Sequence, residues 1–223
     1  ITLEVSVRAP SNARSFSFDW RTFFADFPYA YCNQYDDHFV VQMLPADATE
    51  AFVVFNAAGD WPTINAGDFD VCGCATEPDG TCMVGETAFA CPIGDEQLFG
   101  TGYGAAESGV VRAATTWRRT TVPVTPGSEF TLRFSVWDGG DPINDTTALL
   151  DSFAWHTDSA PAPVTASLHQ VPPTCGNGSI DVGESCDPEA VAARPCNDLF
   201  PGTVGDILCT DTCTERYVLC QIP

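Results

Sequence analysis

The sequence contains no lysine, and its nine basic residues are all arginines, against 30 acidic residues in a chain of 223. The absence of lysine excludes Schiff-base chemistry, the phosphate-binding lysine of P-loop sites and lysine–asparagine isopeptide cross-links. The formal net charge of −21 argues against nucleic acid or an anionic membrane surface as a partner, because both would be repelled. Cations are the small partners that such a charge attracts.

Long hydrophobic runs and catalytic signatures are also missing. No apolar run approaches the roughly 20 residues of a membrane-spanning helix. The chain begins at Ile1 and shows no signal-peptide pattern, so we expect a mature, soluble protein without direct membrane insertion. The motifs G-x-S-x-G, H-E-x-x-H and the glycine-rich phosphate loop do not occur. The sequence therefore predicts a protein that is not an enzyme. The alternative, a metal-dependent extracellular hydrolase, would need a site without these motifs.

Cysteine, in contrast, is abundant, with eleven residues. So many thiols favour disulfide bonds and an oxidising compartment, which predicts a secreted or extracellular cell-surface protein. Five cysteines precede residue 159 and six follow it, so one lacks a partner if each part pairs internally. That thiol is either free, part of a bridge between domains, or a link between subunits. The predicted disulfide cysteines are Cys32, Cys72, Cys74, Cys82, Cys91, Cys175, Cys186, Cys196, Cys209, Cys213 and Cys220.

Hydrophobic and polar residues alternate in several segments, as expected for half-buried strands. Phe16, Phe18 and Trp20 share one face of such a segment, and small polar residues share the other. Seven runs of this kind, mostly separated by Gly, Pro or Asp clusters, predict an all-β, jelly-roll-like antiparallel β-sandwich. The predicted strands span residues 1–7, 15–20, 38–44, 51–55, 115–124, 129–137 and 148–155.

Composition divides the chain into three predicted parts. Residues 1–158 carry the strand patterns, interrupted near residues 56–110 by a long Gly-, Asp- and Cys-rich loop region. Residues 159–174 are rich in Pro and Ala, as is typical of a semi-extended linker. Residues 175–223 contain six cysteines and few large apolar residues, which predicts a small module stabilised by disulfides. Six cysteines allow 15 pairings, and the sequence does not choose among them.

Acidic residues gather in two predicted loops. Asp138, Asp141 and Asp145 share a short loop that Asp151 follows, and Asp36 and Asp37 lie in another loop downstream of Asp26. Carboxylates this close repel each other unless a hard cation neutralises them, and oxygen ligands in an extracellular setting favour Ca²⁺. The alternative is that Asp and Gly simply form turns here. The three histidines lack zinc-ligand spacing.

Aromatic residues in or near the loops allow a second kind of site. Trp61, Trp117, Tyr103 and Tyr31 can form a stacking platform for sugars or can anchor loops in the core. Both interpretations stay open at the level of the sequence.

Three segments resemble the choice-of-anchor L domain of exported proteins from myxobacteria and other bacteria. Residues 16–28 and 36–39 are similar to its F-x-F-x-S-E-E-Y-P-E-F…N-D-x-F run, although Tyr29 and Asp36 depart from it. Residues 70–103 look like a Cys-containing insertion of myxobacterial members. Residues 122–153 closely match V-x-P-G-E-x-x-x-L-x-F-x-I-x-D-x-G-D-x-x-x-D-S-x-x-L-L-D-x-F, with Thr146 in place of Ser.

The C-terminal part carries a further resemblance. Residues 175–187, CGNGSIDVGESCD, resemble the opening of the myxococcal cysteine-rich repeat, C-G-N-G-x-x-D-x-G-E-x-C-D. The usual continuation of that repeat is replaced here by residues 188–195.

These resemblances imply an exported β-sandwich with acidic loops near one end and no catalytic reaction. The implied metal ligands are Asp26, Asp37, Asp138, Asp141 and Asp145, with Asp36 and Asp151 in second rank. We therefore expect an extracellular structural or adhesive surface protein, stabilised by calcium, that forms a fibre or surface layer. Its expected partners are further copies of itself or surface polysaccharide. The alternative function is calcium-dependent, lectin-like carbohydrate binding.

Overall fold

The computed structural model describes residues 1–28, 31, 34–45, 51–56, 58–72, 81–84, 87–104, 112–140, 144–190, 194–217, 219–220 and 222–223. Over these residues the fold is all-β with two short 3-10 helices, which confirms the predicted class. No helix in these ranges is long and apolar enough to cross a membrane. The elements are β1 (Thr2–Arg8), β2 (Ser15–Phe24), β3 (His38–Pro45), β4 (Ala51–Phe52), β5 (Val71–Cys72), β6 (Thr81–Val84), β7 (Thr87–Ala90), η1 (Asp95–Leu98), β8 (Ala113–Ala114), β9 (Arg118–Pro123), β10 (Glu129–Trp137), β11 (Thr147–His156), β12 (Val164–Ser167), β13 (Arg194–Pro195), η2 (Cys196–Asp198), β14 (Asp206–Cys209) and β15 (Glu215–Arg216).

The chain forms two compact units, and each is described by itself. The sandwich unit comprises Ile1–Asp26, Ala30–Asp68 and Thr116–His169. The cysteine-rich unit comprises Phe27–Tyr29, Phe69–Thr115 and Gln170–Pro223. The predicted division of the sequence at residues 158 and 174 stays a prediction. In the folded chain, the segment 69–115 belongs to the same unit as the C-terminal residues.

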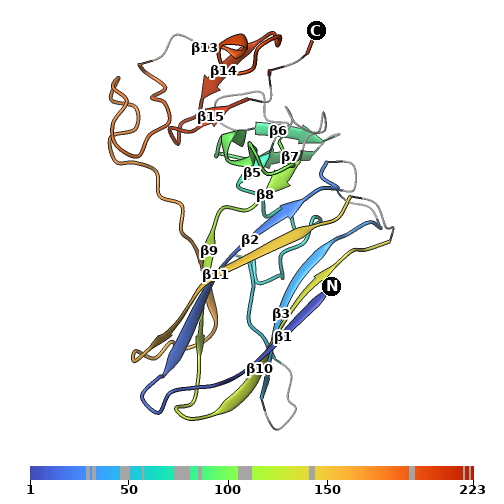
Figure 1. Ribbon diagram of the computed structural model, residues 1–223, viewed down its shortest axis with the longest axis vertical. Helices are drawn as coiled ribbons and strands as arrows, with labels where there is room; N and C mark the ends of the chain where they lie inside the picture. Colours follow the sequence, from blue (N-terminus) through green and yellow to red (C-terminus); the bar gives the residue numbers. More distant parts are fainter. Residues whose placement is uncertain are drawn as a thin grey trace. The chain divides into compact units, whose positions relative to one another are not determined.

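Two antiparallel sheets make up the sandwich unit. The first has the strand order β1-β10-β3-β4, so β1 lies at one edge (Figure 1). In the second, β9 pairs with β2 on one side and with β12 on the other, and β11 pairs with β2. All of these pairings are antiparallel, which is the sandwich arrangement that the alternating pattern predicts.

Aromatic side chains from both sheets fill the core of the sandwich unit. Phe16 of β2 stacks against Phe130 of β10 with ring centroids 5.3 Å apart. Trp20 is fully buried, lies 5.3 Å from the ring of Phe39, and donates a hydrogen bond from Nε1 to Thr120 Oγ1 (2.9 Å). Burying an aromatic side chain of this kind contributes on the order of 2–3 kcal/mol. The alternation along β2 thus determines which side chains form this core, but β2 is not half-buried as expected, because its polar residues, such as Ser17 and Asp19, are buried too.

One part of the predicted linker is a strand. β12 lies within residues 159–174 and pairs with β9 over Val164–Ser167. Its sequence, VTAS, has two β-branched residues between prolines, and Thr165 Oγ1 lies 2.8 Å from Thr120 Oγ1. The linker prediction is therefore corrected at residues 164–167: prolines flank the strand but do not occupy it, so backbone pairing with β9 remains available.

Among the described residues, the cysteine-rich unit contains four disulfides, which show how eight of the eleven cysteines pair. They are Cys72–Cys91, Cys175–Cys213, Cys186–Cys209 and Cys196–Cys220. All six C-terminal cysteines pair with one another, so the cysteine left over from an odd total is one of the remaining three. Cys32 and Cys74 lie outside the described residues, and the side chain of Cys82 is not described.

Within the cysteine-rich unit, residues 91–96 of the Cys-containing insertion are hydrogen-bonded to the C-terminal residues. Glu96 Oε2 accepts a hydrogen bond from the backbone N–H of Glu215 (2.8 Å), and Arg216 Nη2 donates to the carbonyl of Cys91 (3.1 Å). The N–H of Gly94 donates to Thr214 Oγ1 (2.6 Å). A Cβ at position 94 would lie 2.0 Å from the Glu215 carbonyl oxygen, so only glycine permits this approach.

Candidate functional site

Asp37 lies at the centre of the acidic region that the sequence singles out. Its side chain is fully buried. One carboxylate oxygen accepts the backbone N–H of Gly139 (3.0 Å), and the other accepts the hydroxyl of Thr146 (2.5 Å). The Asp37 carbonyl also accepts the N–H of Ile64. The fold therefore brings the two predicted acidic loops together, with Asp37 as the acceptor that joins them.

Glycine makes this close approach possible. A Cβ on Gly139 would lie 2.4 Å from the backbone carbonyl oxygen of Asp36, and Gly140 has a φ of +98°. A Cβ on Gly140 would lie 3.1 Å from the carbonyl oxygen of Gln34, so the turn after β10 packs directly on the backbone that precedes β3. Any side chain at position 139 would force the two loops apart.

The other predicted metal ligands have diverse surroundings. Asp36 accepts the N–H of Asn65 (2.9 Å), Asp138 is half-buried, and Asp145 is exposed. Asp26 is buried. Asp151 lies in the middle of β11, at a bulge where its carboxylate accepts the N–H of Ser152 (2.6 Å). Asp141 lies outside the described residues, so the complete ligand set stays a prediction.

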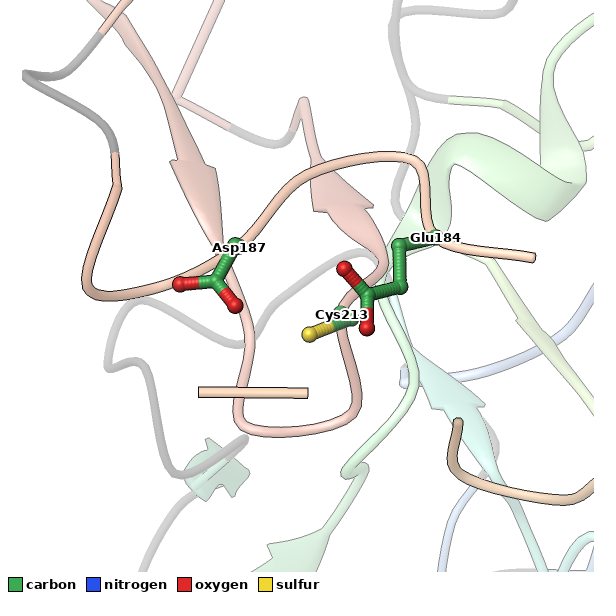
Figure 2. A group of neighbouring side chains, drawn as sticks. All are labelled: Glu184, Asp187 and Cys213. Atoms are coloured by element: carbon green, nitrogen blue, oxygen red, sulfur yellow. The ribbon is translucent and has the colours of Figure 1, made fainter. Parts of the chain in front are cut away.

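Three potential ligand groups do converge elsewhere, in the cysteine-rich unit. Among the described residues, only the ligand atoms of Glu184, Asp187 and Cys213 form a set of three within 4.8 Å of one another (Figure 2). However, Cys213 is bonded to Cys175 in a disulfide, so its sulfur is no thiolate ligand. The carboxylate of Asp187 is engaged by backbone groups instead. This cluster is therefore a structural element of the fold.

The carboxylate of Asp187 accepts hydrogen bonds from several backbone N–H groups. Its Oδ2 accepts the N–H groups of Gly176 and Asn177, at 2.8 and 3.0 Å. Its Oδ1 accepts those of Gly178, Glu189 and Ala190, at 2.8 to 3.2 Å. Burial favours the protonated form, but the N–H groups of Glu189, Gly176, Gly178 and Asn177 together lower the pKa of Asp187 below its usual value of 3.8. The spacing C-G-N-G…C-D thus has a local physical reason.

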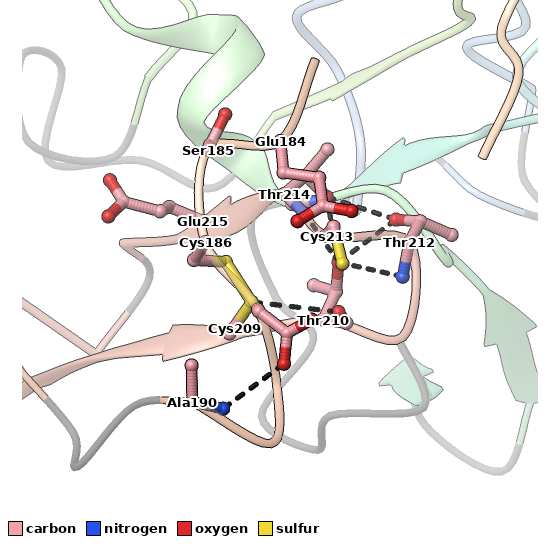
Figure 3. The surroundings of a disulfide bond; sticks show 12 residues. Glu184, Ser185, Cys186, Ala190, Cys209, Thr210, Thr212, Cys213, Thr214 and Glu215 are labelled. Carbon is pink, nitrogen blue, oxygen red and sulfur yellow. Dashed lines mark hydrogen bonds between the residues drawn. A yellow bond between two sulfur atoms is a disulfide. The ribbon is translucent and has the colours of Figure 1, made fainter. Parts of the chain in front are cut away.

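Threonine hydroxyl groups form a second set of polar contacts in the C-terminal segment. Thr210 Oγ1 lies 2.9 Å from Thr212 Oγ1 and 2.7 Å from Thr214 Oγ1, close to the Cys186–Cys209 disulfide (Figure 3). Burial raises the pKa of Glu96, which also accepts a hydrogen bond from Ser185 Oγ (2.8 Å). The C-terminal segment is thus held by polar contacts and disulfides, with a small apolar cluster around Ile207.

The stability of the cysteine-rich unit is expected to fall in acid because of Asp187. A carboxyl group with a lowered pKa stabilises the fold above its unfolded value of 3.8, and this contribution is lost as the pH falls through the lowered pKa. Melting curves followed by circular dichroism between neutral pH and strong acid should show this loss. In Asp187→Asn the amide does not titrate, so the variant should start less stable and lose less in acid. Asp211→Asn, an exposed aspartate of the same unit, serves as the control. Equal acid sensitivity in the wild type and Asp187→Asn would contradict this role.

A further feature of the sandwich unit was not predicted from the sequence. An apolar cavity of about 370 Å³ opens between the edge strand β1 and β11; we call it the edge cleft. Leu3 and Val5 of β1 and Leu150 and Phe153 of β11 line it, and these four side chains are 38 to 52% exposed. Alternation indicated that one face of β1 is apolar, but not that the fold leaves this face partly uncovered.

Comparisons with protein-family models, curated proteins and solved structures found no match for this chain. The resemblance to the choice-of-anchor L domain and to the myxococcal repeat therefore stays a prediction from motifs.

Proposed function

We propose that this chain is an exported, non-enzymatic structural or adhesive protein of the cell surface, and that it associates with further copies of itself through the β1 edge. Four disulfides are typical of proteins in an oxidising compartment, which supports export. Calcium at the joined acidic loops is part of the proposal and rests on their oxygen ligands. The edge cleft is the observation that carries self-association, because a patch of exposed apolar side chains beside an unpaired strand edge favours strand addition.

Every second residue of β1 directs its backbone N–H and C=O groups away from β10, where they can pair with another strand. Ile1 and Val136 exchange both backbone hydrogen bonds, at 2.8 and 3.0 Å. In an antiparallel ladder every second residue bonds to the same neighbour, so Leu3, Val5 and Val7 bond to β10. Residues 2, 4, 6 and 8 then direct their N–H and C=O groups away from the sheet, and in the described structure no strand pairs with this edge.

Charge selects one register for pairing β1 with β1 of a second copy. If two β1 strands pair antiparallel about Ser6, the outward-directed backbone groups of residues 4, 6 and 8 meet those of 8, 6 and 4. Glu4 then lies opposite Arg8 in both directions, and opposite charges in such pairs are favourable. A shift that pairs Glu4 with itself would place like charges together. The same pairing aligns Val5 of one copy with Val7 of the other, so apolar side chains of both copies share one face.

Sedimentation velocity of Ser6→Pro and Ser6→Thr tests this proposal. Proline removes the outward N–H at position 6 and is tolerated on an edge strand, whereas threonine keeps the N–H. The wild type and Ser6→Thr should dimerise as concentration rises, and Ser6→Pro should shift at least tenfold toward the monomer. Matching circular dichroism spectra would show that all three are folded. A wild type that stays monomeric, or a Ser6→Pro variant that dimerises equally, would refute association through this edge.

A further inference from the structure

The outward face of the β1-β10-β3-β4 sheet carries an aromatic groove. Three aromatic side chains line it, together with smaller polar and apolar ones, around a cavity of about 320 Å³. Trp137, Trp61 and Phe52 are 68, 39 and 37% exposed. Large aromatic side chains are costly to leave in water unless a ligand covers them, so a cluster of three marks a candidate binding surface. The lining residues are His38, Val40, Gln42, Phe52, Trp61, Ser135, Trp137 and Gly139.

Strand register explains why these side chains gather on one face. Trp137 pairs with His38 across β10 and β3, and Gln42 pairs with Phe52 across β3 and β4. Directly paired residues lie on the same face of a sheet, and the alternate residues Phe39 and Val41 point into the core. The groove therefore has a sheet as its floor, with positions fixed by backbone pairing.

The wall of the groove is held in place before any ligand binds. Asn56 Oδ1 accepts the N–H groups of Ala58 and Asp60, both at 2.9 Å, which fixes the turn that leads to Trp61. The Phe39 N–H donates to the carbonyl of Pro62 (3.0 Å), so the chain runs beside β3 at this point. The Trp61 ring lies 5.0 Å from the ring of Phe52, centroid to centroid. A rigid wall reduces the conformational entropy lost on binding.

Polar groups on the same face have little net charge. Arg133 Nε donates to Glu4 Oε1 (2.7 Å), and Arg133 Nη1 lies 3.5 Å from Gln42 Oε1. Ser135 Oγ lies 3.2 Å from Thr2 Oγ1. The face thus combines aromatic rings with amide, hydroxyl and charge-paired guanidinium groups. A flat ligand whose apolar C–H face is edged by hydroxyl groups matches this combination, since the rings cover the C–H face and the polar side chains bond to the hydroxyls.

From these observations we infer that the aromatic groove binds a neutral, pyranose-based polysaccharide. The chain's net charge of −21 opposes an anionic glycan, and the Arg133–Glu4 pair leaves no surplus positive charge on this face to offset it. Binding needs no metal ion, because the lining residues that form the groove include no carboxylate. The inference goes beyond self-association through the β1 edge and does not depend on it, since the groove lies on the sheet face and not at its edge.

Isothermal titration with neutral oligosaccharides tests the inference. The probes are hexasaccharides of β-1,4-glucan, β-1,3-glucan, α-1,4-glucan and mannan, each with and without a calcium chelator. At least one should bind in both conditions. Trp137→Ala should weaken that binding roughly tenfold or more, as for other exposed tryptophans at the centre of a binding site. Trp137→Phe, which keeps an aromatic face, should lose less.

The control is Leu149→Ala, which truncates a 42%-exposed apolar side chain of β11 outside the groove. It should bind like the wild type. Absence of binding by every hexasaccharide, equal binding by Trp137→Ala, or binding that the chelator abolishes would each overturn the inference. Binding of Ser6→Pro at wild-type strength would show that the groove and the β1 edge act separately.

Discussion

Reducing the disulfides at neutral pH is expected to unfold the C-terminal segment of the cysteine-rich unit while the sandwich unit stays folded. Three disulfides close spans of 38, 23 and 24 residues in the C-terminal segment, and each contributes about 3–4 kcal/mol in chain-entropy terms. The apolar cluster there is small: Cys196, Ile207 and Cys220, with Phe200 and Tyr217 against it. Two of its three buried members are themselves a disulfide pair, so little apolar burial remains to offset the entropy of the reduced chain.

The core of the sandwich unit, in contrast, contains no cysteine among its described members. Its stability comes from buried aromatic and aliphatic side chains such as Phe16, Trp20 and Leu132. Hydrogen exchange measured by mass spectrometry, with and without a phosphine reductant, separates the two units. Peptides of β2, β3 and β10 should keep their protection, and peptides of residues 175–217 should lose it.

A variant supplies the control for this experiment. Replacing Cys186 and Cys209 together with serine should reproduce part of the effect without reductant, because this disulfide links the Asp187 region to β14. Simultaneous loss of protection in both units on reduction would show that the sandwich unit depends on the disulfides, contrary to this prediction.

Replacing Asp37 with alanine is expected to destabilise the sandwich unit by about 3 kcal/mol or more. The substitution leaves the N–H of Gly139 and the hydroxyl of Thr146 without their carboxylate acceptor at a fully buried position. A hydrogen bond to a charged group contributes about 1.5–3 kcal/mol, and two are lost together. Urea unfolding followed by tryptophan fluorescence should show the lower midpoint. Asp60→Ala, an exposed aspartate of the same unit, should change it by less than about 0.5 kcal/mol.

Asp37→Asn distinguishes the shape of the side chain from its charge. The amide oxygen can accept the N–H of Gly139 and the NH₂ group can donate to the hydroxyl oxygen of Thr146, but both hydrogen bonds then lack the negative charge. The loss should therefore lie between those of the wild type and Asp37→Ala. Full stability in both variants would show that the two loops are joined by other contacts.

Calcium titration of the same proteins addresses the proposed metal. If the joined loops bind Ca²⁺, millimolar calcium should raise the melting temperature of the wild type, and a chelator should reverse this. Asp145→Asn removes an exposed carboxylate and should reduce the shift. An unchanged melting temperature in calcium would remove the metal from the proposal, while the effect of Asp37→Ala would remain.

Alternation along single strands made much of the sandwich predictable. All seven predicted runs contain a strand, and β10 spans Glu129–Trp137, the predicted residues 129–137. The inward side chains of β2 and β10 followed from the same period. β12 was not predicted, because the prolines on either side of it gave the whole segment the composition of a linker. Its four residues are nevertheless enough to pair with the neighbouring strand β9.

The site was predictable in part. The sequence located Asp37 and the Asp138 loop as separate acidic segments, and the motif resemblance grouped them as metal ligands. It did not indicate that Asp37 would be buried as a hydrogen-bond acceptor for Gly139 and Thr146, more than 100 residues away in the chain. Such pairing depends on which strands become neighbours, a property of the whole sheet and not of a local pattern.

The sequence by itself determined the strand class, the side chains of β2 and β10 that point into the aromatic core, and the need for disulfides in the C-terminal part, because these depend on residue periodicity and composition. Only the tertiary structure decided which cysteines pair, that residues 69–115 form one unit with the C-terminal segment, and that Trp137, Trp61 and Phe52 share a groove. It also decided that Leu3 and Val5 stay partly uncovered at an edge. Each of these outcomes requires contacts between residues far apart in the chain, and no local pattern encodes which distant segments will meet.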